Sequence, residues 1–117
     1  LFLRNDVEAT VLRLPGQLFE HKGENISNVF TYKIVNKTVH DFENIHFKLL
    51  NPEGEIKAVG KENFKIIKGE MSQGTLFIEI HPNNLAGDKT EIKIGVFNGD
   101  DLIETEKTNF LGPRSFN

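Results

Sequence analysis

Four histidines and one methionine are the side chains of this sequence best suited to bind a soft metal ion: His21, His40, His46, His81 and Met71. Imidazole and thioether groups are good ligands for copper(I). No two of the histidines stand two or four residues apart, the spacing that places two ligands on one face of a strand or a helix. We therefore interpret the histidines as solvated side chains. A transient copper contact through His81 or Met71 is the alternative.

The acidic residues match no catalytic or calcium-binding pattern. Five of them occupy positions that we assign to outward strand faces: Glu8, Glu79, Glu91, Glu104 and Glu106. The sequence has no G-x-S-x-G elbow and no glycine-rich phosphate loop. It also has no cysteine, which excludes a disulfide, a thiolate zinc site, an iron–sulfur cluster and a cysteine nucleophile. We expect no catalytic, cofactor-binding or metal-binding residue in this chain.

The composition fits one soluble domain. A chain of 117 residues can bury a core without disulfides, and ten phenylalanines beside one tyrosine and no tryptophan supply mainly apolar rings. Fourteen basic against seventeen acidic residues give a net charge of -3, which argues against a nucleic-acid-binding protein. The apolar runs are shorter than the roughly 20 residues that span a bilayer.

Alternation of apolar and polar residues predicts a series of short β-strands. The segments are VEATVLRL (7–14), VFTYKIV (29–35), NIHFKLL (44–50), EIKAVG (55–60), NFKIIKG (63–69), GTLFIEIHP (74–82), TEIKIGVF (90–97) and LIETEKTNF (102–110). In the first, imperfect alternation favours an edge strand. In the others, the predicted inward residues are Phe30, Tyr32, Ile34, Ile45, Phe47, Leu49, Leu76, Ile78, Ile80, Ile92, Ile94 and Val96.

Three connections carry their own signals. The segment 51–55 (NPEGE) predicts a turn in which Gly54 has a positive φ. Asn98-Gly99 predicts a tight hairpin with positive φ at both central residues. The segment 82–88 predicts one helical turn in a crossing between sheets. Together with the strands, these signals predict an all-β fold, an immunoglobulin-like or fibronectin-like antiparallel sandwich of about seven to eight strands without a disulfide.

Four segments in this order resemble the C-terminal immunoglobulin-like domain of the FixG/CcoG family, accessory proteins of cbb3-type cytochrome oxidase assembly: VLRLPGQLFE (11–20), ISNVFTYKIVNKT (26–38), NIHFKLL (44–50) and TNFLGP (108–113). The family strand pattern I-x-N-x-(Y/F)-x-x-K-(I/L)-x-N-K is matched by Ile26, Asn28, Phe30, Lys33, Ile34, Asn36 and Lys37. The resemblance covers nearly the whole chain, from about residue 3 to residue 113.

The resemblance implies a parent protein that is a membrane-anchored polyferredoxin linked to copper(II) reduction, with its [4Fe-4S] clusters bound outside this fragment. It places the domain on the periplasmic side of the bacterial inner membrane. The fragment is then a non-catalytic module, and its expected partners are oxidase-assembly or copper-delivery proteins, not nucleic acid. An unrelated cell-surface binding module is the other alternative, although the lack of tryptophan counts against sugar binding.

The resemblance also sets the expected domain limits. The opening LFLR has the apolar-then-basic order of a membrane-helix end, so residues 1–6 are interpreted as a membrane-proximal juncture. Residues 7–113 form the sandwich, and residues 114–117 form a frayed tail. Asn28 and Asn36 are each expected to cap a strand end by bonding nearby backbone.

Overall fold

The structure is a computed structural model that describes residues 7–14, 16, 19–60 and 63–113. The predicted juncture (1–6) and tail (114–117) lie outside these residues. Within them there are nine strands: β1 (Val7–Arg13), β2 (Glu20–Lys22), β3 (Asn25–Asn36), β4 (Phe42–Asn51), β5 (Glu55–Ala58), β6 (Phe64–Ile66), β7 (Met71–Ile80), β8 (Lys89–Asn98) and β9 (Asp101–Leu111). This part of the chain has no helix long and apolar enough to cross a bilayer.

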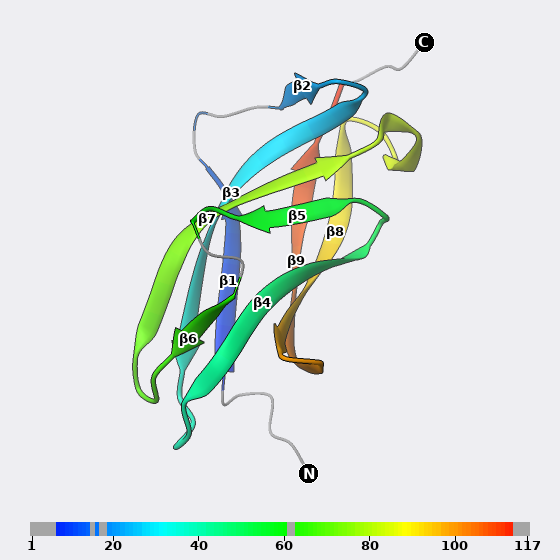
Figure 1. Cartoon of the computed structure of the whole chain (residues 1–117). Helices are drawn as coiled ribbons and strands as arrows, with labels where there is room; N and C mark the ends of the chain where they lie inside the picture. The colour runs from blue at the N-terminus through cyan, green and yellow to red at the C-terminus, as the bar shows by residue number, and fades with distance from the viewer. Residues whose placement is uncertain (1–6, 15, 17–18, 61–62, 114–117) are drawn as a thin grey trace.

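The strands form two antiparallel sheets that pack face to face (Figure 1). Sheet A has the order β1-β3-β7-β5, with β2 also paired to β3, and sheet B has the order β6-β4-β8-β9. The predicted all-β immunoglobulin-like sandwich is therefore confirmed. It has one strand more than the eight segments predicted, the three-residue β2.

Strand β3 is the central element of sheet A because it pairs with β1 on one side and with β7 on the other. Its alternation places Phe30, Tyr32 and Ile34 on the inner face, and all three are buried as predicted. Strand β1 lies at the end of the sheet, which confirms the predicted edge strand. Its outward Leu12 is 60% exposed, whereas Val11 is 1% exposed.

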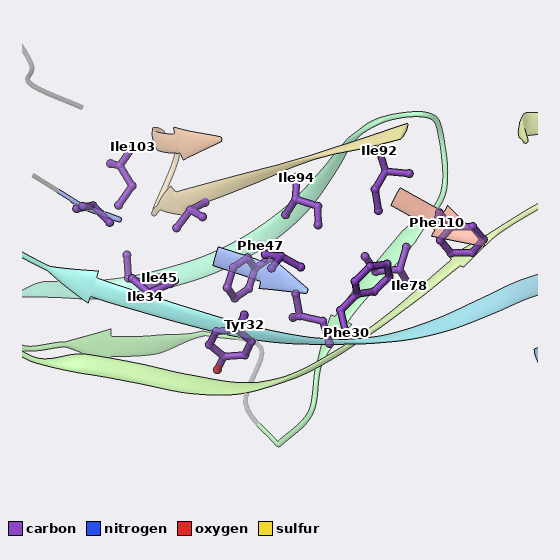
Figure 2. Packing of buried hydrophobic residues seen from close by; sticks show 14 of the residues in the cluster. Phe30, Tyr32, Ile34, Ile45, Phe47, Ile78, Ile92, Ile94, Ile103 and Phe110 are labelled. Atoms are coloured by element: carbon purple, nitrogen blue, oxygen red, sulfur yellow. The ribbon is translucent and has the colours of Figure 1, made fainter. Parts of the chain in front are cut away.

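The core lies between the sheets and is built from the inward rows of both (Figure 2). Three aromatic rings pack together in it: the ring centroid of Tyr32 lies 4.8 Å from that of Phe47 and 5.7 Å from that of Phe64. Of the predicted inward residues only Leu49 is partly buried, and it still packs against the core. Burial of this apolar area is what favours the sandwich in a chain without disulfides.

The turns at Gly54 and Gly99 differ in backbone conformation from those predicted. Gly54 has no positive φ, so that prediction was wrong. A Cβ at this position would lie 2.7 Å from the carbonyl oxygen of Glu79 and 2.9 Å from the Leu49 side chain, so glycine is needed for close approach. In the hairpin between β8 and β9, Gly99 alone has a positive φ, of 62°, where two such residues were expected. Glycine at the first central position is the type II′ arrangement.

The segment after β7 contains the predicted helical turn, a 3-10 helix over Pro82–Asn84. It lies in the connection that takes the chain from β7 in sheet A to β8 in sheet B. The imidazole Nδ1 of His81 accepts a hydrogen bond from the Asn83 N–H at 3.1 Å and caps this turn. His81 therefore has a structural contact of its own at the end of β7.

Asn28, on the inner face of β3, is 1% exposed and binds the end of β9. Its Nδ2 donates to the Leu111 carbonyl at 2.9 Å, and the Leu111 N–H donates to its Oδ1 at 2.7 Å. The side-chain amide thus pairs with Leu111 as a neighbouring peptide group would. The prediction that Asn28 bonds nearby backbone was wrong, since its partner lies 83 residues away in sequence.

Asn36 lies at the other end of β3 and is 0% exposed. Its Nδ2 donates to the carbonyls of His40, at 2.8 Å, and Ile66, at 3.1 Å. Its Oδ1 accepts from the backbone N–H and the hydroxyl of Thr38. The predicted bonds to nearby backbone are confirmed here, and the bond to Ile66 in β6 adds a link from sheet A to sheet B.

A β-bulge between Val96 and Phe97 changes the face to which β9 presents its acids. Beyond it, Glu104 and Glu106 lie opposite Val96 and Ile94, which are fully buried. The prediction that both glutamates point outward was therefore wrong. Burial raises the pKa of Glu106, and the charge of Glu104 adds to this, while hydrogen bonding to the backbone of Val11 in β1 and of Lys107 opposes it.

Candidate functional site

The four histidines lie in separate parts of the sandwich. His21 is exposed on β2, where its ring meets that of Phe19 edge-on at 5.7 Å, and His40 is exposed in the loop after β3. His46 is on the outer face of β4, as predicted, but it is not fully solvated. Its ring stacks on that of Phe97 at 5.6 Å, and its Nδ1 is buried without a hydrogen-bond partner.

Met71 and His81, the two residues of the alternative copper contact, are separated by the length of β7. Met71 begins this ten-residue strand and His81 follows its last residue. At about 3.3 Å per residue, roughly 33 Å separate their backbones, so they cannot bind one ion together. Among the described residues, no group of three or more histidine or acidic side chains lies close enough to hold a metal ion.

The nearest approach to an acidic site is a hollow of about 400 Å³ beside the end of β7. Its lining residues are Asn25, Glu53, Gly54, Glu55, Glu79, His81 and Asn84. Hydrogen bonds within the chain already use several of these groups. Asn25 donates to the Glu79 carboxylate at 3.5 Å, and Asn84 donates to the Glu53 carbonyl at 3.2 Å. The hollow is therefore a place where strand ends and loops are hydrogen-bonded to one another, and we do not assign it a ligand.

A second surface hollow, of about 370 Å³, lies on the outer face of sheet A. Its lining residues are Thr10, Leu12, Thr31, Tyr32, Lys33, Gln73, Gly74 and Thr75. Lys33 and Tyr32 are the ionisable groups of this lining, and no carboxylate or imidazole accompanies them. The hollow therefore lacks the paired acid and base that proton-transfer catalysis uses.

Tyr32 occupies the inner face of β3, opposite Gly74 of β7. A Cβ on residue 74 would lie 2.8 Å from the tyrosine hydroxyl oxygen, so the glycine makes room for the ring. Burial raises the pKa of Tyr32 above its ordinary value of 10.0, and a hydrogen bond with Ser72 partly offsets that rise. A raised pKa keeps the hydroxyl neutral at ordinary pH, so it is not an activated acid.

We predict that the tyrosinate absorbance of the folded chain develops above pH 10.0, and that urea moves its midpoint down toward 10.0. Because the folded pKa is the higher one, the stability linked to Tyr32 is fully present below the unfolded pKa and is lost as pH rises through the folded pKa. Ultraviolet titration measures this without interference, since the chain has one tyrosine and no tryptophan. Equal midpoints with and without urea would contradict it.

The outer face of sheet B carries a small apolar cluster around Gly95 of β8. This glycine is buried although it faces outward, because the side chains of Leu50, Phe97 and Leu102 close over it. Leu50 and Leu102 remain 39% and 47% exposed. The sequence signal for this cluster was the glycine at an outward position of the predicted strand TEIKIGVF, because a glycine within a strand often marks a site where other groups approach the backbone closely.

Comparisons with known proteins decide the family. No curated protein matches the chain. Residues 1–113 match the family described as "IG-like fold at C-terminal of FixG, putative oxidoreductase". The chain belongs to this FixG C-terminal family. The suspected resemblance is thereby confirmed, and the FixG match extends over nearly the whole sequence.

A solved structure supports the FixG fold. The crystal structure of a FixG-related protein from Vibrio parahaemolyticus superposes with a TM-score of 0.69. The two chains are 21% identical, and the alignment covers 91% of this chain and 95% of that one. At this identity the likeness establishes a shared fold.

The FixG strand pattern is now explained by packing. Its apolar members Ile26, Phe30 and Ile34 are in the core, and its asparagines Asn28 and Asn36 hold β3 to sheet B. Its two lysines are exposed on the surface. The residues on which the resemblance was based therefore help to hold the two sheets together.

Proposed function

We propose that this FixG-type domain is a non-catalytic module on the periplasmic side of the bacterial inner membrane, where it contacts proteins of cbb3-type oxidase assembly or copper delivery. The observation that carries the proposal is the separation of its potential ligands. His46 lies on the outer face of sheet B, His21 on β2, and Met71 and His81 at opposite ends of β7.

The lack of cysteine in this chain indicates which part of a FixG-type parent would carry out the redox chemistry. Iron–sulfur clusters are bound by cysteine thiolates, and this chain has none. Cluster binding and any electron transfer to copper(II) then belong to other segments of the parent. A β-sandwich with exposed apolar side chains on both outer faces, such as Phe77 and Leu102, is suited to protein contact.

The test uses the intact parent protein with and without this domain. We expect its removal to abolish co-purification with oxidase subunits or copper carriers, and to leave cluster absorbance and copper(II) reduction per mole of parent unchanged. Replacement by an unrelated sandwich domain is the control for a spacer effect. Unchanged association and oxidase maturation after deletion would refute the partner role, and loss of copper(II) reduction would refute the non-catalytic role.

A further inference from the structure

We propose that the outer face of β4, β8 and β9 binds a short acidic polypeptide segment that carries one large apolar side chain. This inference deepens the proposed partner-binding role and rests on it. Two properties of this face lead to the proposal: an apolar cluster that the fold leaves partly exposed, and lysines that lie opposite one another without an ion pair to the described acidic residues.

The apolar centre of this face is made possible by Gly95. A Cβ there would lie 2.8 Å from the Phe97 ring, 3.0 Å from Leu102 and 3.1 Å from Leu50. These three side chains can pack over residue 95 because glycine has no side chain. His46 supports the Phe97 ring from the side by stacking on it. The cluster is thereby held in a fixed arrangement, as in the apolar centre of a protein interface.

Three lysines border this centre. Lys48 lies with its Nζ 4.9 Å from the centroid of the Phe97 ring. Lys93 of β8 and Lys107 of β9 are direct cross-strand partners, and both are exposed. Like charges opposite each other destabilise a sheet. The lysine ion pairs in the described part of the chain belong to Lys37 and Lys65 instead.

The charges on this face favour an acidic segment as the ligand. In a chain of net charge -3, three neighbouring lysines beside exposed leucines are complementary to carboxylates around an apolar side chain. Acids limit this basic band on both sides, with Glu91 one row beyond Lys93 and with Asp100 and Asp101 in the hairpin. A continuous anionic lipid surface would be repelled by these flanking carboxylates, whereas a narrow segment across the strands avoids them.

The dimensions agree with a short segment. Strands about 4.8 Å apart place β4 and β9 roughly 10 Å from each other, which about four extended residues cross. Such a segment sets its apolar side chain on the cluster around Gly95 and its carboxylates near Lys48, Lys93 and Lys107.

The probe is a short synthetic peptide of glutamates around one leucine, added to the whole ¹⁵N-labelled 117-residue chain. We expect saturable shifts of the amide signals of Lys48, Lys93, Gly95 and Phe97, weakened by salt because the contact is partly ionic. A peptide with lysines in place of the glutamates, and vesicles of phosphatidylglycerol, should leave these signals unchanged. Absence of saturable shifts, equal binding of the basic peptide, or vesicle binding through this face would overturn the assignment.

Lys93→Glu separates binding from folding. The substitution replaces a like-charge pair by a Glu–Lys pair with Lys107, so we expect a raised unfolding midpoint together with about tenfold weaker peptide binding. The control is Lys33→Glu, which makes the same charge change on the outer face of sheet A and should leave binding unaltered. Equal effects of both variants on binding would show a net-charge effect and refute the site.

The same variant in the intact parent distinguishes failure of this inference from failure of the proposed function. We expect Lys93→Glu to reduce association with oxidase-assembly proteins as domain removal does. Association that is lost on removal of the domain but retained in Lys93→Glu would refute this surface alone. Association retained in both would refute the partner role itself.

Discussion

Replacing Phe30 with alanine should lower the free energy of unfolding by about 3–5 kcal/mol. The Phe30 side chain is 0% exposed and points from β3 into the space between the sheets (Figure 2). Its removal deletes a large apolar ring and leaves a cavity that the paired strands on either side cannot close. In a chain whose sheets are joined without disulfides, this loss is a large part of the total stability.

Phe77 supplies the matched control for this experiment. It lies in β7, on the outer face of the same sheet, and is 42% exposed. We expect Phe77→Ala to cost less than about 1 kcal/mol, because truncation there opens no cavity. Urea unfolding followed by circular dichroism measures both variants. A cost below 1 kcal/mol for Phe30→Ala would show that the inner face of β3 has been assigned incorrectly.

The second large effect is expected from Asn36→Ala, at about 3–4 kcal/mol. This substitution removes the donor to the carbonyls of His40 and Ile66 and the acceptor for Thr38. The bond to Ile66 is buried, and a buried polar group left without a partner costs about 1–3 kcal/mol, to which the part-buried bonds to His40 and Thr38 add smaller losses. Because His40 and Thr38 belong to the loop after β3 and Ile66 belongs to β6, the loss loosens both segments at once.

Two further variants make the Asn36 experiment specific. Asn36→Asp keeps the acceptor oxygen but faces two carbonyls with a carboxylate, so it should be at least as destabilising as alanine. Asn109→Ala, on the exposed face of β9, should change stability by less than about 0.5 kcal/mol. Hydrogen exchange locates the effect, because the Thr38 amide should lose protection first. If Asn36→Ala behaved like Asn109→Ala, the hydrogen bonds of Asn36 would not stabilise the fold.

The strands and their inner faces could be predicted because period-two alternation is a local property of the sequence. Residues such as Ile78 and Ile94 are inward for the same reason as Phe30: each belongs to a row of apolar side chains at every second position of its strand. Strand β2 was missed because its residues, Glu-His-Lys, are all polar and exposed. It forms by pairing with the start of β3 after a turn at Gly23, which has a φ of 60°.

Features that depend on contacts distant in sequence could not be predicted. The partner of Asn28 is Leu111, at the far end of the described chain, and no local pattern links the two. The need for glycine at the outward position 95 becomes clear only in the folded sheet, where Leu50 of β4 and Leu102 of β9 pack over it. The bulge near Val96, which turns two glutamates inward, likewise depends on the pairing of β8 with β9.

The inward turn of those glutamates also bears on aggregation. The two long edge strands, β1 and β9, lie next to each other, and hydrogen bonding of the Glu106 carboxylate to the Val11 backbone joins them. Inward-pointing charge on an edge strand is a known protection against strand addition by another molecule. The other edge elements, β2, β5 and β6, are three or four residues long. With its edges protected in this way, the domain is expected to stay monodisperse at high concentration.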